Sequence, residues 1–381
     1  MREKTLGVGI IGCGTFCDAY IGTFKENYSN IRVISCSDLD MERANATAKK
    51  WELAKAYSTE EMLQDSEVDL VLIVTTPGSH YLLTKQALLA GKHVYCEKPM
   101  ATSFEQAREL KELAASKGLI TAAAPDTFLS TEFQTVRKLI DDGAIGKVIS
   151  FTANFAGPGA DMWHPNPEFL YKAGGGPVLD MAPYFISNLV ALFGAIDRIF
   201  GFATRGFDTR IIHGNECSVD VLTDYCGVIS FKDGTIGNIN MSYDRWKSML
   251  PGLEIYGTDG VIFAPDPNTM KGDILLLRAD KFRSAVENEP EFGKKMAMIY
   301  GPDTMKLFET VETVEPRLGN QRGRGIFDIA EAITSGRAPR ISAEFCVHVT
   351  EAMFALDSCK NRSAAYTMET DCDRPESLYK A

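Results

Sequence analysis

The sequence lacks the features that mark several large classes of protein. Its net charge is −11, so it has no basic excess with which to bind nucleic acid or an anionic membrane surface. Its apolar run at 189–193 is far too short to cross a bilayer, which takes about 20 apolar residues. No basic segment followed by an apolar core is visible near the start, so we expect no signal peptide and a cytoplasmic protein.

Paired cysteines and a P-loop are also missing. The nine cysteines include no Cys-x-x-Cys pair, and such an unpatterned set fits a reduced compartment better than a disulfide framework. We predict no metal site. No GxxxxGK[ST] motif occurs, so the chain does not resemble a P-loop kinase. A length of 381 residues with 45% apolar content indicates a globular protein of two domains or one elaborated domain.

Strands and helices alternate in the first part of the chain. The continuously apolar run 70–74 is typical of a strand that helices cover on both faces. Capping-box pairs precede two helices, and a glycine follows each of the predicted helices 81–90 and 104–117. We therefore predict an α/β Rossmann domain with a parallel, doubly wound sheet at 1–125. The expected strands are 6–11, 32–37, 70–75, 93–96 and 119–123, and the capping pairs are Ser58 with Glu61 and Ser103 with Gln106.

Residues 126–381 are predicted to form an α+β domain with a large, mostly antiparallel open sheet. The turn signals 232–234 and 258–260 each separate two strand-like runs, as in a β-hairpin. Two late helices follow and can pack back on the first domain. The tail after Arg362 is polar and expected at the surface. The strand-like runs are 219–230, 235–243, 253–256 and 261–264, and the late helices are 326–335 and 344–358.

A dinucleotide-binding loop is predicted at Gly12-Cys13-Gly14-Thr15-Phe16, between the first strand and a helix. Gly12 would allow the tight turn, and Gly14 would let backbone amides approach a pyrophosphate at the helix N-terminus. Cys17 stands where the usual fingerprint has a third glycine. The alternative is an ordinary strand-turn-helix.

Further cofactor contacts are expected where other strands end. Asp38 follows the second strand, where a carboxylate accepts hydrogen bonds from the ribose 2′-hydroxyl and repels a 2′-phosphate, which favours NAD over NADP. Thr75-Thr76-Pro77 can line the cofactor's path. His80 is expected to cap or support rather than to catalyse, and Asp126 should face the nicotinamide.

The segment Gly91-Lys92-His93-Val94-Tyr95-Cys96-Glu97-Lys98-Pro99 is a short apolar strand that ends in an acid, a base and a proline. Ligands bind at the carboxyl ends of strands in open α/β sheets, so Lys98 would meet the cofactor there. Removing a hydroxyl proton requires a base with a pKa near the working pH, so the pKa of this lysine must be depressed. The alternative is a surface lysine paired with Glu97.

These motifs resemble the Gfo/Idh/MocA oxidoreductase family. The resemblance implies a Rossmann domain, an open-sheet substrate domain that often mediates oligomers, and NAD(P)-linked oxidation or reduction of sugars, glycosides or polyols. It implies that Lys98 transfers a proton, that the Lys98–Pro99 bond is cis, and that the protein is a homodimer or homotetramer. The matching residues are Gly12-Cys13-Gly14, Thr76-Pro77 with His80, Gly91 to Val94 running into Glu97-Lys98-Pro99, and Gly174-Gly175-Gly176 leading to Asp180.

A second set of catalytic candidates lies near a loop rich in glycine and proline. We expect a helix to begin at about Asp180, which would place Asp180 and Tyr184 on one helical face. Tyr184 stands where the family usually has histidine, and His164 in the loop is a replacement candidate. Asp180 would orient the substrate or Lys98, while Tyr184 would hydrogen-bond the reactive oxygen. Alternatively, Asp180 is a helix cap and Tyr184 an ordinary core residue.

The leading hypothesis is an NAD-dependent oxidoreductase that acts on a secondary alcohol of a sugar, glycoside or cyclic polyol. One alternative is a redox-neutral enzyme that cleaves glycosides by oxidising and re-reducing the sugar in place. Another is a non-catalytic sensor that binds NAD and a partner protein. Retention of Lys98 and Asp180 argues against the sensor.

Overall fold

The structure, a computed structural model, describes residues 5–319 and 321–379, which form two compact units. The first contains the described residues up to 127, those of 318–354, and 369–375. The second contains 128–317, 355–368 and the described residues from 376 onward. Within these ranges, no helix is both long and apolar enough to cross a membrane.

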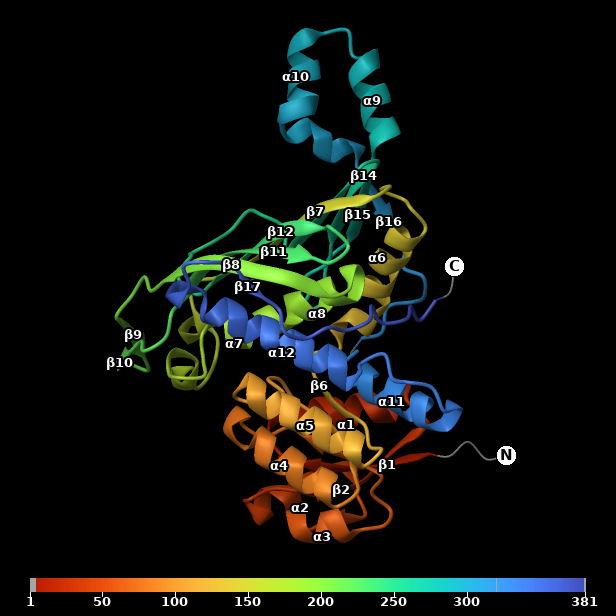
Figure 1. Cartoon of the computed structure of the whole chain (residues 1–381), viewed down its shortest axis with the longest axis vertical. Coiled ribbons are helices and arrows are strands. Elements are labelled where there is room, and N and C mark those ends of the chain that lie inside the picture. The colour runs from red at the N-terminus through yellow and green to blue at the C-terminus, as the bar shows by residue number, and fades with distance from the viewer. Residues whose placement is uncertain (1–4, 320, 380–381) are drawn as a thin grey trace. The chain divides into compact units, whose positions relative to one another are not determined.

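The first unit contains a six-stranded parallel sheet in the order β3-β2-β1-β4-β5-β6. Figure 1 shows its helices α1 to α5 in red and orange. Parallel strands joined by helices confirm the predicted Rossmann architecture. The strands are β1 Leu6–Ile11, β2 Ile31–Ser37, β3 Lys55–Ala56, β4 Leu70–Ile73, β5 His93–Cys96 and β6 Thr121–Ala123. The helices are α1 Thr15–Asn27, α2 Met41–Trp51, α3 Thr59–Gln64, α4 Pro77–Leu89, α5 Phe104–Ser116, α11 Arg324–Ser335 and, across the division between units, α12 Ala343–Asp357.

Local sequence signals account for most of these boundaries. The capping box of Ser58 and Glu61 is present at the start of α3. The predicted box at Ser103 is only half formed, because the Gln106 side chain accepts hydrogen bonds from Thr102 instead. Helix α4 begins at Pro77, earlier than predicted, since proline suits a first helical turn. Strand β3 has two residues, too few to show a pattern.

The second unit contains a nine-stranded sheet in the order β16-β15-β14-β13-β7-β12-β11-β8-β17. Only β7 and β12 pair in parallel among these neighbours, so the mostly antiparallel sheet is confirmed. Its strands are β7 Val148–Ala156, β8 Ile196–Thr204, β11 Asp224–Phe231, β12 Ile236–Ser242, β13 Leu253–Gly257, β14 Gly260–Ala264, β15 Ile274–Arg278, β16 Glu309–Val311 and β17 Tyr366–Thr367. A separate hairpin comprises β9 Thr209–Ile212 and β10 Asn215–Ser218.

Helices cover one face of this sheet. Phe193 of α8 packs against Phe151 and Phe231, with ring centroids 5.7 and 5.4 Å apart. On the opposite face Phe202, Val228 and Ile236 are each more than half exposed. Figure 1 shows the α9–α10 hairpin, which follows β15 in the chain, projecting away from the sheet. The helices of this unit are α6 Thr131–Asp141, α7 Pro177–Asp180, α8 Ala182–Phe193, α9 Ala279–Asn288 and α10 Phe292–Tyr300. Its 3₁₀ turns are 127–129 at the unit boundary, 160–162, 168–171, 302–307 and 359–361.

One prediction for the later sequence was wrong in part. The strand expected from residue 219 begins at Asp224. The tail after Arg362 is polar and mostly exposed or half-buried, as predicted, and it also contributes the edge strand β17, which pairs with β8. Farther along, the amides of Glu369 and Thr370 donate to the buried carboxylate of Glu351. Main-chain pairing cannot be inferred from the polarity of side chains.

Candidate cofactor and substrate sites

The loop after β1 has the conformation that a dinucleotide fingerprint requires. Gly12 has φ +103°, and a Cβ there would lie 2.8 Å from the carbonyl oxygen of Val74, so only glycine fits. Gly14 is the N-cap of α1 and provides no side-chain cap. The first-turn amides, including those of Thr15 and Phe16, therefore remain available to bind an anion. This arrangement fits the pyrophosphate of a dinucleotide.

Asp38 lies just beyond β2 and is held by backbone amides. Its Oδ2 accepts the Cys13 amide at 2.8 Å and its Oδ1 accepts the Asp40 amide at 2.9 Å. The Arg43 guanidinium lies 3.7 Å from the same Oδ2. The carboxylate is thus fixed beside the glycine loop, which fits a contact with the adenosine ribose.

His80 connects the loops that follow β4 and β5. Its ring is buried, with Nδ1 2.8 Å from the carbonyl oxygen of Pro99 and Nε2 3.0 Å from that of Thr75. Thr75 also exchanges a hydrogen bond with Ser79 at 2.7 Å. Both ring nitrogens face backbone carbonyls, which suits a supporting role for His80 better than a catalytic one.

The tip of β5 presents Lys98 from a tightly held turn. The carboxylate of Glu97 is buried and accepts the Tyr20 hydroxyl at 2.8 Å and the Lys98 amide at 3.1 Å. Burial, and then the charge of Glu97, raise the pKa of Tyr20 well above its usual value, so Tyr20 remains a donor. The Lys98–Pro99 bond is cis, as the resemblance implied. Lys98 itself is partly exposed.

Two more charged residues of the first unit lie near these loops. Asp126 is buried, and its Oδ2 accepts the Gly325 amide at 2.7 Å in the first turn of α11. Burial raises the pKa of Asp126, although the Gly325 amide opposes that shift. The guanidinium of Arg322 lies 5.4 Å from the ring centroid of Phe16, in the first turn of α1. Sequence reasoning missed Arg322 because no local motif marks it.

Asp180 and Tyr184 do not share one helix. Asp180 ends α7, and Tyr184 lies in α8, which begins at Ala182. Pro183 has no amide with which to continue the hydrogen-bond ladder of α7, so the chain starts a new helix. The expected helix start at Asp180, and with it the helix-cap alternative, was wrong.

Tyr243, at the end of β12, is the partner of Asp180. Its hydroxyl donates to Asp180 Oδ2 at 2.5 Å, and the residue is only 1% exposed. Burial raises the pKa of Tyr243 far above its usual value, and the charge of Asp180 raises it further. Tyr243 therefore stays protonated and holds the carboxylate in one orientation.

A buried arginine anchors the loop that carries the other candidates. Arg210 donates to the carbonyl oxygens of Pro158 and Tyr243, both at 2.8 Å, and to Asp244 Oδ1 at 2.6 Å. Asp161 lies 3.6 Å from the same guanidinium and accepts the Tyr171 hydroxyl. One buried cation thus connects the loop to the strand end that bears Tyr243.

Trp163 and His164 lie in this anchored loop. Trp163 is 66% exposed, and the ring centroid of His164 lies 5.3 Å from it and 5.4 Å from that of Phe169. His164 Nδ1 accepts the Asn166 amide at 3.0 Å. The exposed indole suits stacking on an apolar sugar face.

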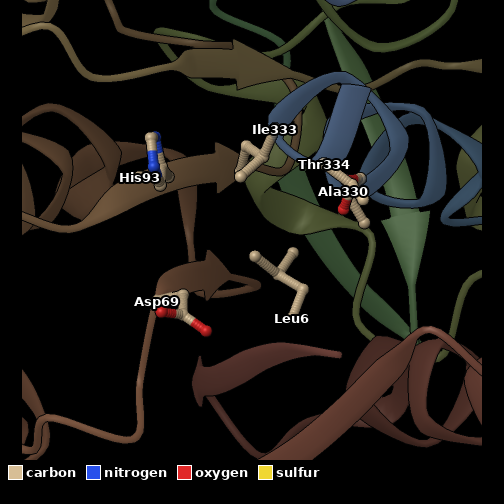
Figure 2. A pocket seen from close by; sticks show the side chains of 6 residues that line it. All are labelled: Leu6, Asp69, His93, Ala330, Ile333 and Thr334. Carbon is tan, nitrogen blue, oxygen red and sulfur yellow. The ribbon is translucent and has the colours of Figure 1, made fainter. Parts of the chain in front are cut away.

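A small pocket in the first unit lies away from the glycine loop of that unit. Figure 2 shows it at the amino-terminal ends of the parallel strands, opposite the edge where Gly12, Asp38 and Lys98 lie. Ligands of such sheets bind at the carboxyl ends, so this pocket does not bear on the cofactor. Its lining residues are Leu6, Asp69, His93, Ala330, Ile333 and Thr334.

Two family models match the chain. One, an oxidoreductase family with an NAD-binding Rossmann fold, matches residues 6–124, and a GFO/IDH/MocA C-terminal domain matches 133–263.

Among curated relatives, an uncharacterized oxidoreductase, C115.03 of Schizosaccharomyces pombe, is 36% identical over 49% of this chain and 51% of its own length. The chain thus spans about half the length of that relative. The 1,5-anhydro-D-fructose reductase of Ensifer adhaerens is 28% identical over 71% of this chain and 80% of its own. The scyllo-inositol 2-dehydrogenase (NADP(+)) IolW of Bacillus subtilis is 22% identical over 95% of this chain and 96% of its own length.

Solved structures share the fold. An NAD binding oxidoreductase from Klebsiella pneumoniae has a TM-score of 0.78 at 20% identity, covering 97% of this chain and 100% of that one. Levoglucosan dehydrogenase in complex with NADH and L-sorbose has a TM-score of 0.77 at 19% identity, covering 96% and 99%.

Proposed function

The chain belongs to the Gfo/Idh/MocA oxidoreductase family, and on that premise we propose that it is an NAD-dependent dehydrogenase or reductase for a secondary alcohol of a sugar, glycoside or cyclic polyol. The observation that carries the proposal is Lys98, held at the carboxyl end of β5 beside the buried Glu97. Relatives named for anhydrofructose, scyllo-inositol and D-glucoside substrates support this substrate class.

In the proposed reaction, side chains of this protein transfer the proton. Bound nicotinamide would accept or donate the hydride. Lys98 takes the hydroxyl proton in oxidation or returns it in reduction, with its backbone fixed by Glu97 and Tyr20. Asp180, aligned by Tyr243, would orient the substrate through its hydroxyl groups, while Tyr184 and His164 would donate or accept further hydrogen bonds.

The proposal favours NAD over NADP. Asp38 is held by two backbone amides and would repel a 2′-phosphate. The nearby Arg43 is drawn toward Asp38 and Asp40, which offsets its attraction for phosphate. We further propose that a second copy of the chain covers the exposed sheet face around Phe202, as the resemblance implied.

A substrate screen tests the proposal directly. Purified protein is incubated with sugars, glycosides and cyclic polyols, each with NAD and with NADP, and release of the reduced cofactor is followed by absorbance. We expect NADH to form with at least one substrate. Product formation without net NADH would favour the redox-neutral alternative, and NAD binding without turnover of any substrate would favour the sensor.

Substitution of the lysine tests its role. Lys98→Met should abolish turnover while NAD still binds, because methionine keeps the bulk and removes the amine. Lys85→Met is the matched control, since Lys85 forms an exposed ion pair with Glu109, and such pairs contribute about 0–1 kcal/mol. Undiminished turnover by Lys98→Met would reject the lysine assignment.

A further inference from the structure

The β9–β10 hairpin forms a two-stranded sheet of its own and holds the loop of residues 157–173. At the start of the hairpin, Arg210 Nη1 donates to the carbonyl oxygen of Pro158 at 2.8 Å. In the turn between the two strands, His213 Nε2 donates to the carbonyl oxygen of Pro165 at 2.7 Å. The hairpin therefore contacts this loop both at its beginning and in its middle.

The far end of the loop is held by the segment that follows β10. The amide of Asp220 donates to the carbonyl oxygen of Tyr171 at 2.8 Å. The side chain of the same Asp220 pairs with Lys172, with Oδ2 and Nζ 2.9 Å apart. The 157–173 loop is thus attached to one short hairpin along its whole length.

Arg210 divides its two amino groups between the loop and the end of β12. Nη1 faces the loop, since it donates to Pro158 and lies 3.6 Å from Asp161 Oδ1. Nη2 faces the strand end, where it donates to the carbonyl oxygen of Tyr243 at 2.8 Å and to Asp244 Oδ1 at 2.6 Å. The side chains of Arg210 and Asp244 are 8% and 7% exposed. Lysine has a single amino group and cannot make both sets of bonds in this geometry.

Gly159 shows how closely the loop fits against Arg210. Its φ is +117°, and a Cβ at this position would lie 2.6 Å from the hydroxyl oxygen of Tyr171 and 3.0 Å from Arg210 Nη1. Any larger residue would push the loop away from the guanidinium. The backbone of the loop is therefore fixed at the point where it meets Arg210.

We propose that Arg210 is a positioning residue for substrate binding, because it holds the 157–173 loop where Trp163 can stack on a cyclic substrate. This inference rests on the proposed function and narrows its substrate to a pyranose or cyclohexane ring with an apolar face. Trp163 is 66% exposed although its loop is anchored, so its indole is presented to ligands from a fixed backbone. Acyclic polyols have no ring face on which an indole can stack. Arg210 thus acts on substrate affinity, whereas Lys98 transfers the proton.

A double-mutant cycle tests whether Arg210 acts through Trp163. Trp163→Ala should raise the KM for the best cyclic substrate by about threefold to tenfold, the range of an aromatic contact, with little change in kcat or in the KM for NAD. Arg210→Lys keeps the buried charge and should raise the same KM by a similar factor. In the double variant the two effects should not multiply, because the group that Arg210 positions is already absent. Two effects that multiply would overturn the proposal.

Arg137→Lys is the matched control. Arg137 is another buried arginine of the second unit, and it donates to Asp141 Oδ2 and to the carbonyl oxygen of Ala191, both at 2.6 Å. These bonds join α6 to α8 and do not involve the 157–173 loop. We expect this variant to lose stability, measured as a denaturation midpoint, and to keep the KM of the wild type. An equal rise in KM would reduce the effect of Arg210→Lys to general destabilisation and overturn the proposal.

Hydrogen exchange followed by mass spectrometry tests the anchoring without any substrate. Within the loop, the amide of Trp163 donates to the carbonyl oxygen of Ala160 at 3.2 Å. In Arg210→Lys, peptides from the 157–173 loop should exchange several-fold faster than in the wild type, because the loop opens more often. In Arg137→Lys the same peptides should exchange at the wild-type rate. Unchanged exchange in Arg210→Lys would overturn the proposal.

Gly159→Ala provides a second route in case Arg210→Lys does not fold. It leaves Arg210 and its bond to Asp244 in place and crowds only the loop side of the anchor. Exchange of the loop and the KM for the cyclic substrate should both rise, as in Arg210→Lys. Wild-type values of both quantities in Gly159→Ala would overturn the proposal.

This inference and the proposed function can fail separately. Acyclic hexitols are added to the substrate screen, and we expect the wild type to prefer a cyclic substrate. A preference for a hexitol over every cyclic compound would overturn the role of Trp163 and leave the dehydrogenase assignment intact. If no compound is turned over, the proposed function and the role of Arg210 in substrate binding both fail, while hydrogen exchange still decides whether Arg210 anchors the loop.

Discussion

Replacing Tyr243 by phenylalanine should impair catalysis by releasing Asp180. The substitution removes one hydroxyl and little volume, and that hydroxyl donates to Asp180 Oδ2 at 2.5 Å. If Asp180 binds the substrate as proposed, its carboxylate would sample other orientations in the variant. The effect should fall mainly on kcat, because the ionised carboxylate is needed to align the reacting hydroxyl.

The size of the effect follows from the buried position of the bond. A hydrogen bond to a charged group contributes about 1.5–3 kcal/mol, so kcat/KM should fall by about 10-fold to 100-fold. The acid limb of the pH profile should also move to higher pH, because the ionised carboxylate loses a donor. Initial rates with the best substrate from the screen, measured across pH, test both expectations.

Tyr225→Phe is the matched control. Tyr225 is also a buried tyrosine of the second unit, and its hydroxyl donates to Asp357 at 2.8 Å. The same atom is lost from the same kind of bond, but Asp180 is not involved. We expect both variants to lose stability and only Tyr243→Phe to lose activity with a shifted pH profile. Equal activity of the two variants, or a lower rate without the pH shift, would refute the reasoning.

Three further predictions concern single side chains. Gly12→Ala should weaken NAD binding and lower the free energy of unfolding, measured by urea titration, by about 1–3 kcal/mol. The reason is that alanine is strained at φ +103° and its Cβ would meet the carbonyl oxygen of Val74. An unchanged affinity for NAD would contradict this prediction. Asp38→Asn should raise the ratio of kcat/KM with NADP to that with NAD by about tenfold; a constant ratio would remove Asp38 from cofactor selection. Burial raises the pKa of Asp357 in the folded state. The contribution of this carboxyl group to the free energy of unfolding is therefore complete below its unfolded pKa near 3.9, and it is lost as pH rises through its folded pKa. Asp357→Asn should therefore stabilise the protein at neutral pH and have little effect near pH 4, measured as denaturation midpoints at both pH values.

The architecture of the first unit and the outline of its cofactor loop could be predicted from the sequence. These depend on local rules. Gly12 is needed because its φ is positive, and Gly14 leaves the N-terminus of α1 without a side-chain cap. Asp38 and Lys98 could be assigned to one edge since parallel strands end together. The alternating strands of the second unit were likewise visible from their turns.

Tertiary structure alone decided the partners of the charged candidates. The bond from Tyr243 to Asp180, the contacts of Arg210 with the loop and with Asp244, and the position of Arg322 over Phe16 join segments distant in the sequence. Such contacts depend on strand order, and the parallel placement of β12 beside β7 has no local signal. The break between Asp180 and Tyr184 was likewise decided by where Pro183 interrupts the helix, and the sequence pattern had suggested one continuous face.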